Sequence, residues 1–155
     1  MKTAKLLKLL PIAFATTALV NLGLPILDVQ LNSSNRVLAQ TTSALKAEAD
    51  RLFQQGGRQY RTGQFEAALR SWQQALAISQ KIKDRGREAA ALELIGTIYL
   101  FQRDYTRASN YMEQSLAIAR AIHDRQGEEQ ALQSLLIAYY ALGDYTRAIE
   151  YQQQS

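Results

Sequence analysis

Cysteine is absent from this 155-residue chain, which excludes disulfides, thiolate metal sites and cysteine nucleophiles. Proline is almost absent, since the only two, Pro11 and Pro25, both lie near the N-terminus. The sequence from Gln40 onward therefore lacks the strongest helix breaker. That stretch is rich in Ala, Leu, Gln, Glu and Arg, which favour helices. We expect an all-α protein.

Histidine occurs once, as His123, in a segment expected to be an exposed turn, which is a poor place for an acid–base catalyst. Glu93, Glu128 and Glu129 have no acidic or histidine partner at metal-ligand spacing, and we expect them on solvated helix faces. No phosphate-binding Gly-rich loop, nucleophile elbow or zinc motif is present. The sequence predicts no enzyme, no cofactor and no metal site.

The excess of positive charge is concentrated near the N-terminus. Four of the 18 basic residues but only one of the 14 acidic residues precede Gln40, so the rest of the chain has a net charge of +1. In that remainder Arg and Lys are interleaved with Glu, Asp and Gln, whereas nucleic-acid binding needs basic residues clustered on one face. We expect no nucleic-acid partner.

Residues 1–39 have the layout of a secretory signal peptide. Three lysines precede an apolar stretch that runs from Leu9 to Leu27, and a polar piece then leads to Val37 and Ala39, the small residues that a signal peptidase selects. We expect cleavage after Ala39 and export to the periplasm, a thylakoid lumen or the extracellular space. The alternative is a retained membrane anchor at residues 6–27, which is long enough to span a bilayer.

The rest of the chain repeats with a period of forty residues. The block Asp-Tyr-Thr-Arg-Ala at residues 104–108 recurs intact at residues 144–148, and Tyr99 and Tyr111 recur as Tyr139 and Tyr151. The same register extends back to the first unit through Leu52, Gly63, Phe65, Ala68, Trp72, Ala75 and Leu76. We divide residues 40–155 into repeats of about 49–88, 89–128 and 129–155, the last of them incomplete.

Each repeat predicts two helices. Leu92, Ile95, Gly96 and Tyr99 share one helix face, and a second apolar face follows from Ala108 onward. Gly63 and Gly143 are placed to end first helices in the left-handed conformation, and Asp104 and Asp144 are placed to cap second helices. Arg103 occupies the position of those glycines, so we expect the middle turn to be less tightly closed.

These residues resemble the tetratricopeptide repeat. Its pattern of a large residue, Leu, Gly and Tyr on the first helix and Ala, an aromatic and Ala on the second is matched by Leu92, Ile95, Gly96 and Tyr99 and by Ala68, Trp72 and Ala75. The usual period is about 34 residues, and the forty-residue period is similar to the lengthened repeats of kinesin light chains and many bacterial scaffold proteins. The resemblance implies a right-handed superhelix of antiparallel helix pairs, with Trp72 buried between its two helices.

The resemblance also implies a concave groove that binds other proteins. Aromatic and aliphatic side chains beside amide and charged groups suit an extended or helical segment of a partner. The groove positions expected from the family's geometry are Phe53, Tyr60, Arg61, Glu93, Thr97, Leu100, Phe101, Gln130, Gln133, Ile137 and Tyr140.

We therefore expect an exported adaptor that binds a protein partner. An alternative is the repeat region of a larger exported enzyme, because the leader and the repeats look like those of cyanobacterial proteins with a caspase-like CHAT protease domain. A third is a membrane-tethered assembly factor. The pattern stops at Ser155 within a second helix, so we expect Leu132, Leu135, Tyr139, Ala148 and Tyr151 to be partly uncovered unless further repeats or a second copy cover them.

Overall fold

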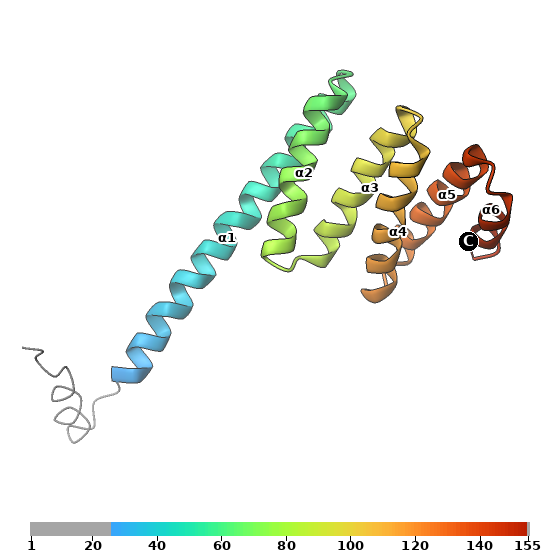
Figure 1. The fold of residues 1–155 in the computed structure, drawn as a ribbon. Helices are drawn as coiled ribbons and strands as arrows, with labels where there is room; N and C mark the ends of the chain where they lie inside the picture. Colours follow the sequence, from blue (N-terminus) through green and yellow to red (C-terminus); the bar gives the residue numbers. More distant parts are fainter. Residues whose placement is uncertain (1–25, 155) are drawn as a thin grey trace, which may run out of the picture. The chain divides into compact units, whose positions relative to one another are not determined.

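A computed structural model describes residues 26–154, which form six α-helices and no strand. The helices are α1 (Ile26–Arg61), α2 (Phe65–Lys81), α3 (Arg85–Phe101), α4 (Tyr105–Ala121), α5 (Arg125–Leu142) and α6 (Tyr145–Gln152). From residue 40 onward they form successive antiparallel hairpins joined by short turns (Figure 1). The all-helical prediction is therefore confirmed for the described residues.

The chain divides into two compact units, Met1–Ala39 and Gln40–Ser155. Residues 1–25, which hold most of the predicted leader, lie outside the described residues. Helix α1 runs through Ala39, where the sequence predicts cleavage. No helix within residues 26–154 combines the length and apolar character needed to cross a membrane. The core and the surfaces described below belong to the second unit.

Aspartate starts four of the six helices. Its carboxylate accepts a hydrogen bond of 3.0–3.1 Å from the backbone N–H three residues later, which satisfies one of the unpaired donors in the first turn. Helix α2 begins after Gln64, whose side chain makes no such bond. The caps predicted at two positions are thus confirmed and occur at two more; the four are Asp84, Asp104, Asp124 and Asp144.

The turns close through residues with positive φ. Gly63 and Gly143 have φ of 75° and 76°, as predicted. Arg103 adopts the same conformation, with φ of 60°, and the backbone N–H after it bonds Tyr99 O at 2.9 Å, compared with 3.0 Å at the glycine turn before α6. The expectation of a looser middle turn was wrong, because the arginine accepts the left-handed conformation and its strain rather than opening the turn.

Replacing Arg103 with glycine should therefore raise the free energy of unfolding by about 1 kcal/mol, because glycine adopts positive φ without the Cβ clash. The matched control is Gln102→Gly, one residue earlier at φ of −75°, where glycine only adds freedom to the unfolded chain and should destabilise. Urea denaturation of both variants measures the difference. A loss of stability in Arg103→Gly would contradict the strained turn.

The core lies within and between the helix pairs. Ala68, Ala108 and Ala148 are fully or almost fully buried at equivalent places near the starts of α2, α4 and α6. Trp72 is only 2% exposed, and its indole Nε1 donates to Phe53 O of α1 at 3.3 Å. Small residues at the closest contacts and large ones in the gaps let neighbouring helices pack densely. The predicted burial of Trp72 is confirmed.

Helix α6 covers α5 more completely than expected. Leu132, Leu135, Tyr139 and Ala148 are all buried, and Tyr151 is partly buried. The expectation that all five would be partly uncovered was wrong for the first four. Although α6 has only eight residues, its Tyr151 ring stacks on Tyr139 with centroids 5.6 Å apart. This contact holds the short helix against α5.

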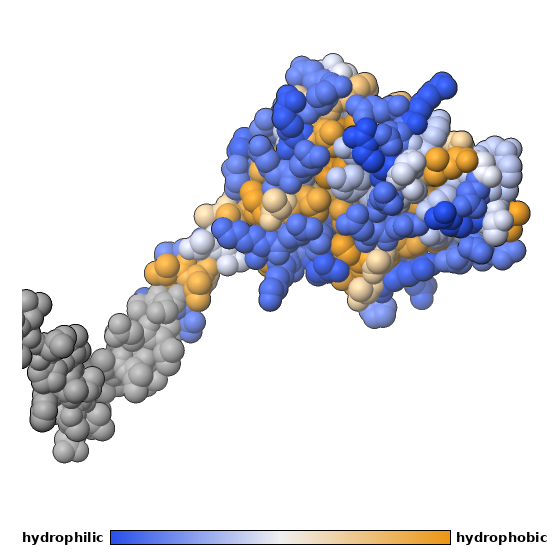
Figure 2. Space-filling view, in the orientation of Figure 1, coloured by the Kyte–Doolittle hydropathy of each residue, from blue (hydrophilic) through white to orange (hydrophobic). Residues whose placement is uncertain are grey.

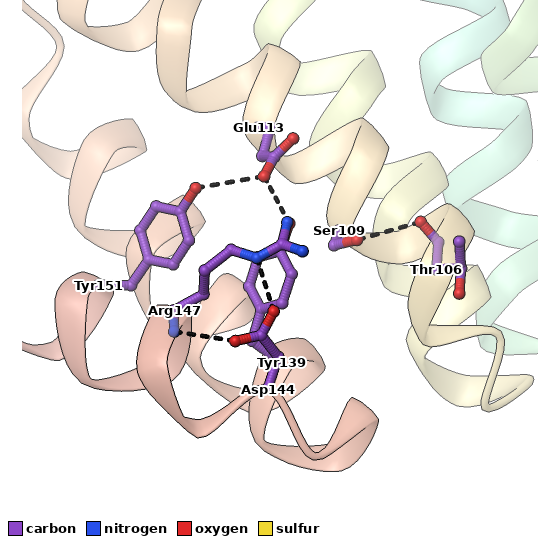
Figure 3. Close-up of polar contacts among 7 residues, drawn as sticks. All are labelled: Thr106, Ser109, Glu113, Tyr139, Asp144, Arg147 and Tyr151. Carbon is purple, nitrogen blue, oxygen red and sulfur yellow. Dashed lines mark hydrogen bonds and ion pairs between the residues drawn. The ribbon is translucent and has the colours of Figure 1, made fainter.

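A polar network reinforces the same contact (Figure 3). Arg147, which pairs with the cap Asp144 at 2.7 Å, lies 4.5 Å over the Tyr139 ring. The hydroxyls of Tyr139 and Tyr151 both donate to Glu113 of α4, at 2.5 and 3.2 Å. Burial and the nearby Glu113 carboxylate raise the pKa of Tyr151 to about 12. Asp144 and Arg147 of the recurring Asp-Tyr-Thr-Arg-Ala block thus connect α6 to α5, and Asp104 and Arg107 make the same pair beside Tyr99 in the preceding repeat.

Candidate partner-binding groove

Helices α1, α3 and α5, together with Ser115 of α4 and Asp124 before α5, line two depressions that meet at Ala90. The first, of about 440 Å³, is lined by Asp50, Phe53, Gln54, Arg87 and Ala90. The second, of about 200 Å³, is lined by Gly86, Ala89, Ala90, Glu93, Ser115, Asp124, Gln126, Gly127 and Gln130. Because Ala90 belongs to both linings, the depressions are adjacent along α3. We call the two together the groove.

An ion-pair network occupies one end of the groove. The Arg87 guanidinium bonds Asp50 of α1 at 2.7 and 2.8 Å and the cap Asp84 at 2.6 Å. The hydrogen bond that Arg87 donates to the Asp50 carboxylate is the main cause that raises the pKa of Arg87, and the bond to Asp84 adds to it. Among the described residues that line the groove, Arg87 is the one cation. Two carboxylates already neutralise it, which leaves it a poor receptor for an acidic peptide.

The other end of the groove is acidic. Glu93 is partly buried beside small residues, and this burial raises the pKa of its carboxyl group above the ordinary value. The negative charge of Asp124 at the start of α5 acts in the same direction. The ionised form of Glu93 therefore destabilises the folded protein at neutral pH. A positive group on a bound segment would remove part of that destabilisation.

The variant Glu93→Gln should be more stable than the natural protein at neutral pH. A raised folded-state pKa means that Glu93 stabilises the fold when protonated, below its unfolded pKa, and loses this contribution as the pH rises through the folded value. Gln is neutral throughout, so its advantage should shrink as the pH falls towards 4. Thermal melts of both proteins between neutral pH and about pH 4 measure this difference in stability. A stability advantage of Glu93→Gln that grew on acidification would contradict the raised pKa of Glu93.

The groove includes some of the residues predicted for it. Phe53, Glu93 and Gln130 line the depressions. Tyr60 and Phe101, both predicted for the groove, pack in an aromatic cluster with Phe65 and Trp72 instead. The remaining predicted residues do not line either depression: Arg61, Gln133, Ile137 and Tyr140 are exposed, and Thr97 and Leu100 are partly buried, with the Thr97 hydroxyl bonded to Glu93 O.

Sequence reasoning missed Asp50, Arg87 and Asp124. Arg87 lies in the first turn of α3 and pairs with Asp50 inside α1, and Asp124 caps α5. The groove follows the N-terminal halves of α3 and α5 rather than their full length. The repeat register could have indicated Asp50, because Asp50, Ala90 and Gln130 occupy the same position in successive helix pairs. All three line the groove.

The described residues contain no group of three His, Cys, Asp or Glu side chains that could hold a metal ion. His123 lies in the exposed turn after α4, with φ of 59°, as predicted. The groove lining places apolar, amide and charged side chains side by side.

Successive helix hairpins around a shared core define a helical-repeat protein. The tetratricopeptide repeat family model matches residues 58–121 and again residues 88–155, and the chain belongs to this family. Its fold is similar to the crystal structure of the TPR domain of Arabidopsis FLU, with a TM-score of 0.67 and 25% identity over 71% of this chain and 92% of that one. No curated protein sequence matches the chain.

Proposed function

We propose that the chain is an adaptor whose groove holds an extended or helical segment of a partner protein. The observation that carries this proposal is the pair of adjacent depressions joined at Ala90. Tetratricopeptide repeats generally serve as protein-interaction scaffolds, which supports the assignment. An aromatic ring at Phe53, an acid at Glu93 and an amide at Gln130 offer three different kinds of contact along one path.

The preferred segment combines an apolar side chain with a positive one. The apolar residue would lie in the larger depression against Phe53, and a Lys or Arg would lie in the smaller one near Glu93 and Asp124. Segments that end in several carboxylates should bind poorly, because Arg87 is already paired with two acids. Charge complementarity of this kind favours one class of partner over others.

A photo-crosslinking amino acid at Ala90 tests the groove directly. When the protein is expressed in its native host, the probe should capture one or a few defined partners. The same probe at Ala77, an exposed residue of α2 outside the groove lining, is the control. Equal adducts at both positions, or none at Ala90, would exclude groove binding.

A blocking variant complements the crosslinking experiment. Ala90→Glu places a long charged side chain where the two depressions meet and should abolish capture, whereas Ala77→Glu should not. Circular dichroism of both variants checks that the helices are retained.

We also propose that the adaptor acts outside the cytoplasm. The lysines, apolar stretch and small residues before Gln40 support export. Mass spectrometry of the mature protein tests this point: an N-terminus at Gln40 in an exported fraction is the expected result. A protein that begins at Met1 in the membrane fraction would instead support the anchor at residues 6–27.

A further inference from the structure

Three of the four aspartates that cap helices also bind an arginine side chain. In each of these caps Oδ1 accepts the backbone N–H three residues later, and Oδ2 accepts a guanidinium N–H of that same residue at 2.6–2.7 Å. The arginines are Arg87, Arg107 and Arg147. In these caps the aspartate is thus paired with a guanidinium group, whose planar fork of N–H groups matches a carboxylate.

The fourth cap, Asp124, lacks this arginine. Its Oδ1 accepts the Gly127 N–H at 3.0 Å, and Gly127 stands where Arg87 stands one repeat earlier. No hydrogen bond or ion pair from residues 26–154 reaches Asp124 Oδ2. That oxygen lies only 2.7 Å from the place where a Cβ at Gly127 would be, so it faces the space from which a side chain would extend. Asp124 therefore keeps one carboxylate oxygen without a cation.

The space next to this oxygen is the smaller depression of the groove. Arg87 is held between its own cap aspartate and Asp50 of α1. One repeat later Ala90 takes the place of Asp50, and Gly127 takes the place of the arginine. Both short residues line the depression, of about 200 Å³, together with Asp124. The depression is therefore the position at which the preceding repeat holds a guanidinium group.

Glu93 supplies a second carboxylate to the same depression. It lines the depression with Asp124, and none of the described lining residues is basic. In the described part of the chain its carboxylate accepts no hydrogen bond. Burial, and after it the negative charge of Asp124, raise the pKa of Glu93. Two acidic groups thus face one depression, and one positive group between them would stabilise the ionised form of both.

We propose that the smaller depression is a binding site for the guanidinium group of an arginine side chain on the partner segment. The guanidinium would bond Asp124 Oδ2, as in the other three caps, and would lie beside Glu93. The arginine that the other three caps have in their own chain is here supplied by the partner. This inference rests on the groove binding proposed above, and it narrows the positive residue of the bound segment to arginine.

Arginine suits this place better than lysine. Its guanidinium presents several N–H groups in a fixed fork, so one group can bond Asp124 and Glu93 together, whereas an ammonium group is a compact and more strongly hydrated charge. In the view of Figure 2 hydrophilic side chains cover most of the repeat unit, and hydrophobic ones show between them. On a surface of this kind two carboxylates without a cation favour one class of polar segment over others.

Titration of the ¹⁵N-labelled protein with N-acetyl-arginine amide tests the site before any partner is identified. The Gly127 N–H resonance, whose acceptor is Asp124, should shift saturably, with half-saturation at about 1–10 mM. N-acetyl-lysine amide should bind at least about threefold more weakly, and the neutral N-acetyl-citrulline amide should not bind. Asp124→Asn keeps an oxygen for the cap but loses the charge, so its affinity for the arginine compound should fall about tenfold. No saturable shift, equal binding of the arginine and lysine compounds, or unchanged binding by Asp124→Asn would overturn the proposal.

A variant that carries the arginine itself gives an independent test. Gly127→Arg should place a guanidinium beside Asp124, lower the pKa of Glu93 towards its ordinary value and remove the response to N-acetyl-arginine amide. Gly127→Gln is the matched control, because it adds the same Cβ next to Asp124 Oδ2 and a long side chain without charge. In this control the pKa of Glu93 should stay raised. Carbon-13 NMR of the glutamate carboxyl groups measures the pKa in both variants, and equal values would overturn the guanidinium site.

Failure of this inference differs measurably from failure of groove binding. The photo-crosslinking probe at Ala90 should lose its adducts when it is combined with Gly127→Arg. If the adducts persist, the groove binds a partner but no arginine enters the depression, and this inference is wrong. If N-acetyl-arginine amide binds as expected while the probe captures nothing, the guanidinium site stands and the adaptor function proposed above is wrong.

Discussion

Replacing Trp72 with alanine is expected to lower the free energy of unfolding by about 3–5 kcal/mol. The indole is 2% exposed, contacts Tyr60 at a centroid distance of 5.7 Å and donates to Phe53 O of α1. Truncation removes the largest side chain between α1 and α2 and leaves a cavity that the surrounding helices can fill only in part. A loss of this size is a large fraction of the stability of a typical domain. Urea denaturation followed by far-UV circular dichroism measures it.

Phe101→Ala is the matched control for this truncation. Phe101 belongs to the same aromatic cluster, but it is 65% exposed, so its loss should cost far less than that of Trp72. Equal losses in the two variants would mean that the cluster, rather than burial between α1 and α2, holds the first hairpin. A further variant, Trp72→Phe, keeps a ring but loses the Nε1 hydrogen bond, so it should lie between the two.

The local rules of the sequence predict most of the fold. Asp104 and Asp144 cap helices because a short carboxylate reaches the free N–H groups of the first turn. Gly63 and Gly143 end helices because glycine takes positive φ without strain. Trp72 is buried because it lies on the apolar face of its helix, at the position that Met112 occupies in the next repeat. The caps and the glycine turns depend on neighbours that are close in sequence, and the burial of Trp72 follows from the repeat pattern; each was correctly predicted.

Features in which the packing of helices overrides the conformational preference of a residue or a short segment were not predicted. Arg103 shows that the packing of α4 against α3 can impose positive φ on a residue that disfavours it. The burial of Leu132 and Leu135 depends on the short α6, which is held by the contacts of Tyr151 and Arg147. A helix of that length is marginal alone. Its stability comes from contacts that periodicity does not reveal.

The groove residues stay a prediction. The family's geometry suggests Phe53, Glu93 and Gln130 as groove positions, and in the structure these three line the two depressions. The repeat register does not show that Arg87 reaches across to Asp50 of the preceding hairpin, at 2.7 Å, because that contact depends on how far the two hairpins are rotated against each other. It also does not show that the Tyr60 ring packs against Phe65 and Trp72.

The second large effect on stability is expected at Gly56, where α1 packs against the Trp72 ring of α2. A Cβ added at Gly56 of α1 would lie 2.4 Å from Nε1 of Trp72 and 2.6 and 2.8 Å from two other atoms of the same ring. The ring is rigid, buried and hydrogen-bonded, so it cannot move aside at low cost. Gly56→Ala should therefore destabilise the protein by about 2 kcal/mol or more, although alanine favours a helix more than glycine does.

The adjacent Gly57 and Gly96, the equivalent of Gly56 in α3, separate this steric effect from helix propensity. Gly57 has only Arg61 Nη1 near its added Cβ, at 3.8 Å, so Gly57→Ala should stabilise by up to about 1 kcal/mol. At Gly96 the added Cβ meets Met112, with Cε at 2.9 Å. A flexible thioether can shift, so the cost should be smaller than at Gly56. Thermal melts of the three alanine variants should give the order Gly57, Gly96, Gly56, from most to least stable.

A double-mutant cycle identifies the cause of the loss at Gly56. In a Trp72→Leu background the rigid ring is gone, so the same Gly56→Ala change should become neutral or stabilising. A coupling energy of about 2 kcal/mol, with a change of sign, would assign the effect to the contact between these two residues. If Gly56→Ala destabilises both backgrounds equally, the glycine is required for another reason, and the close packing of α1 on α2 through Trp72 is not what makes it necessary.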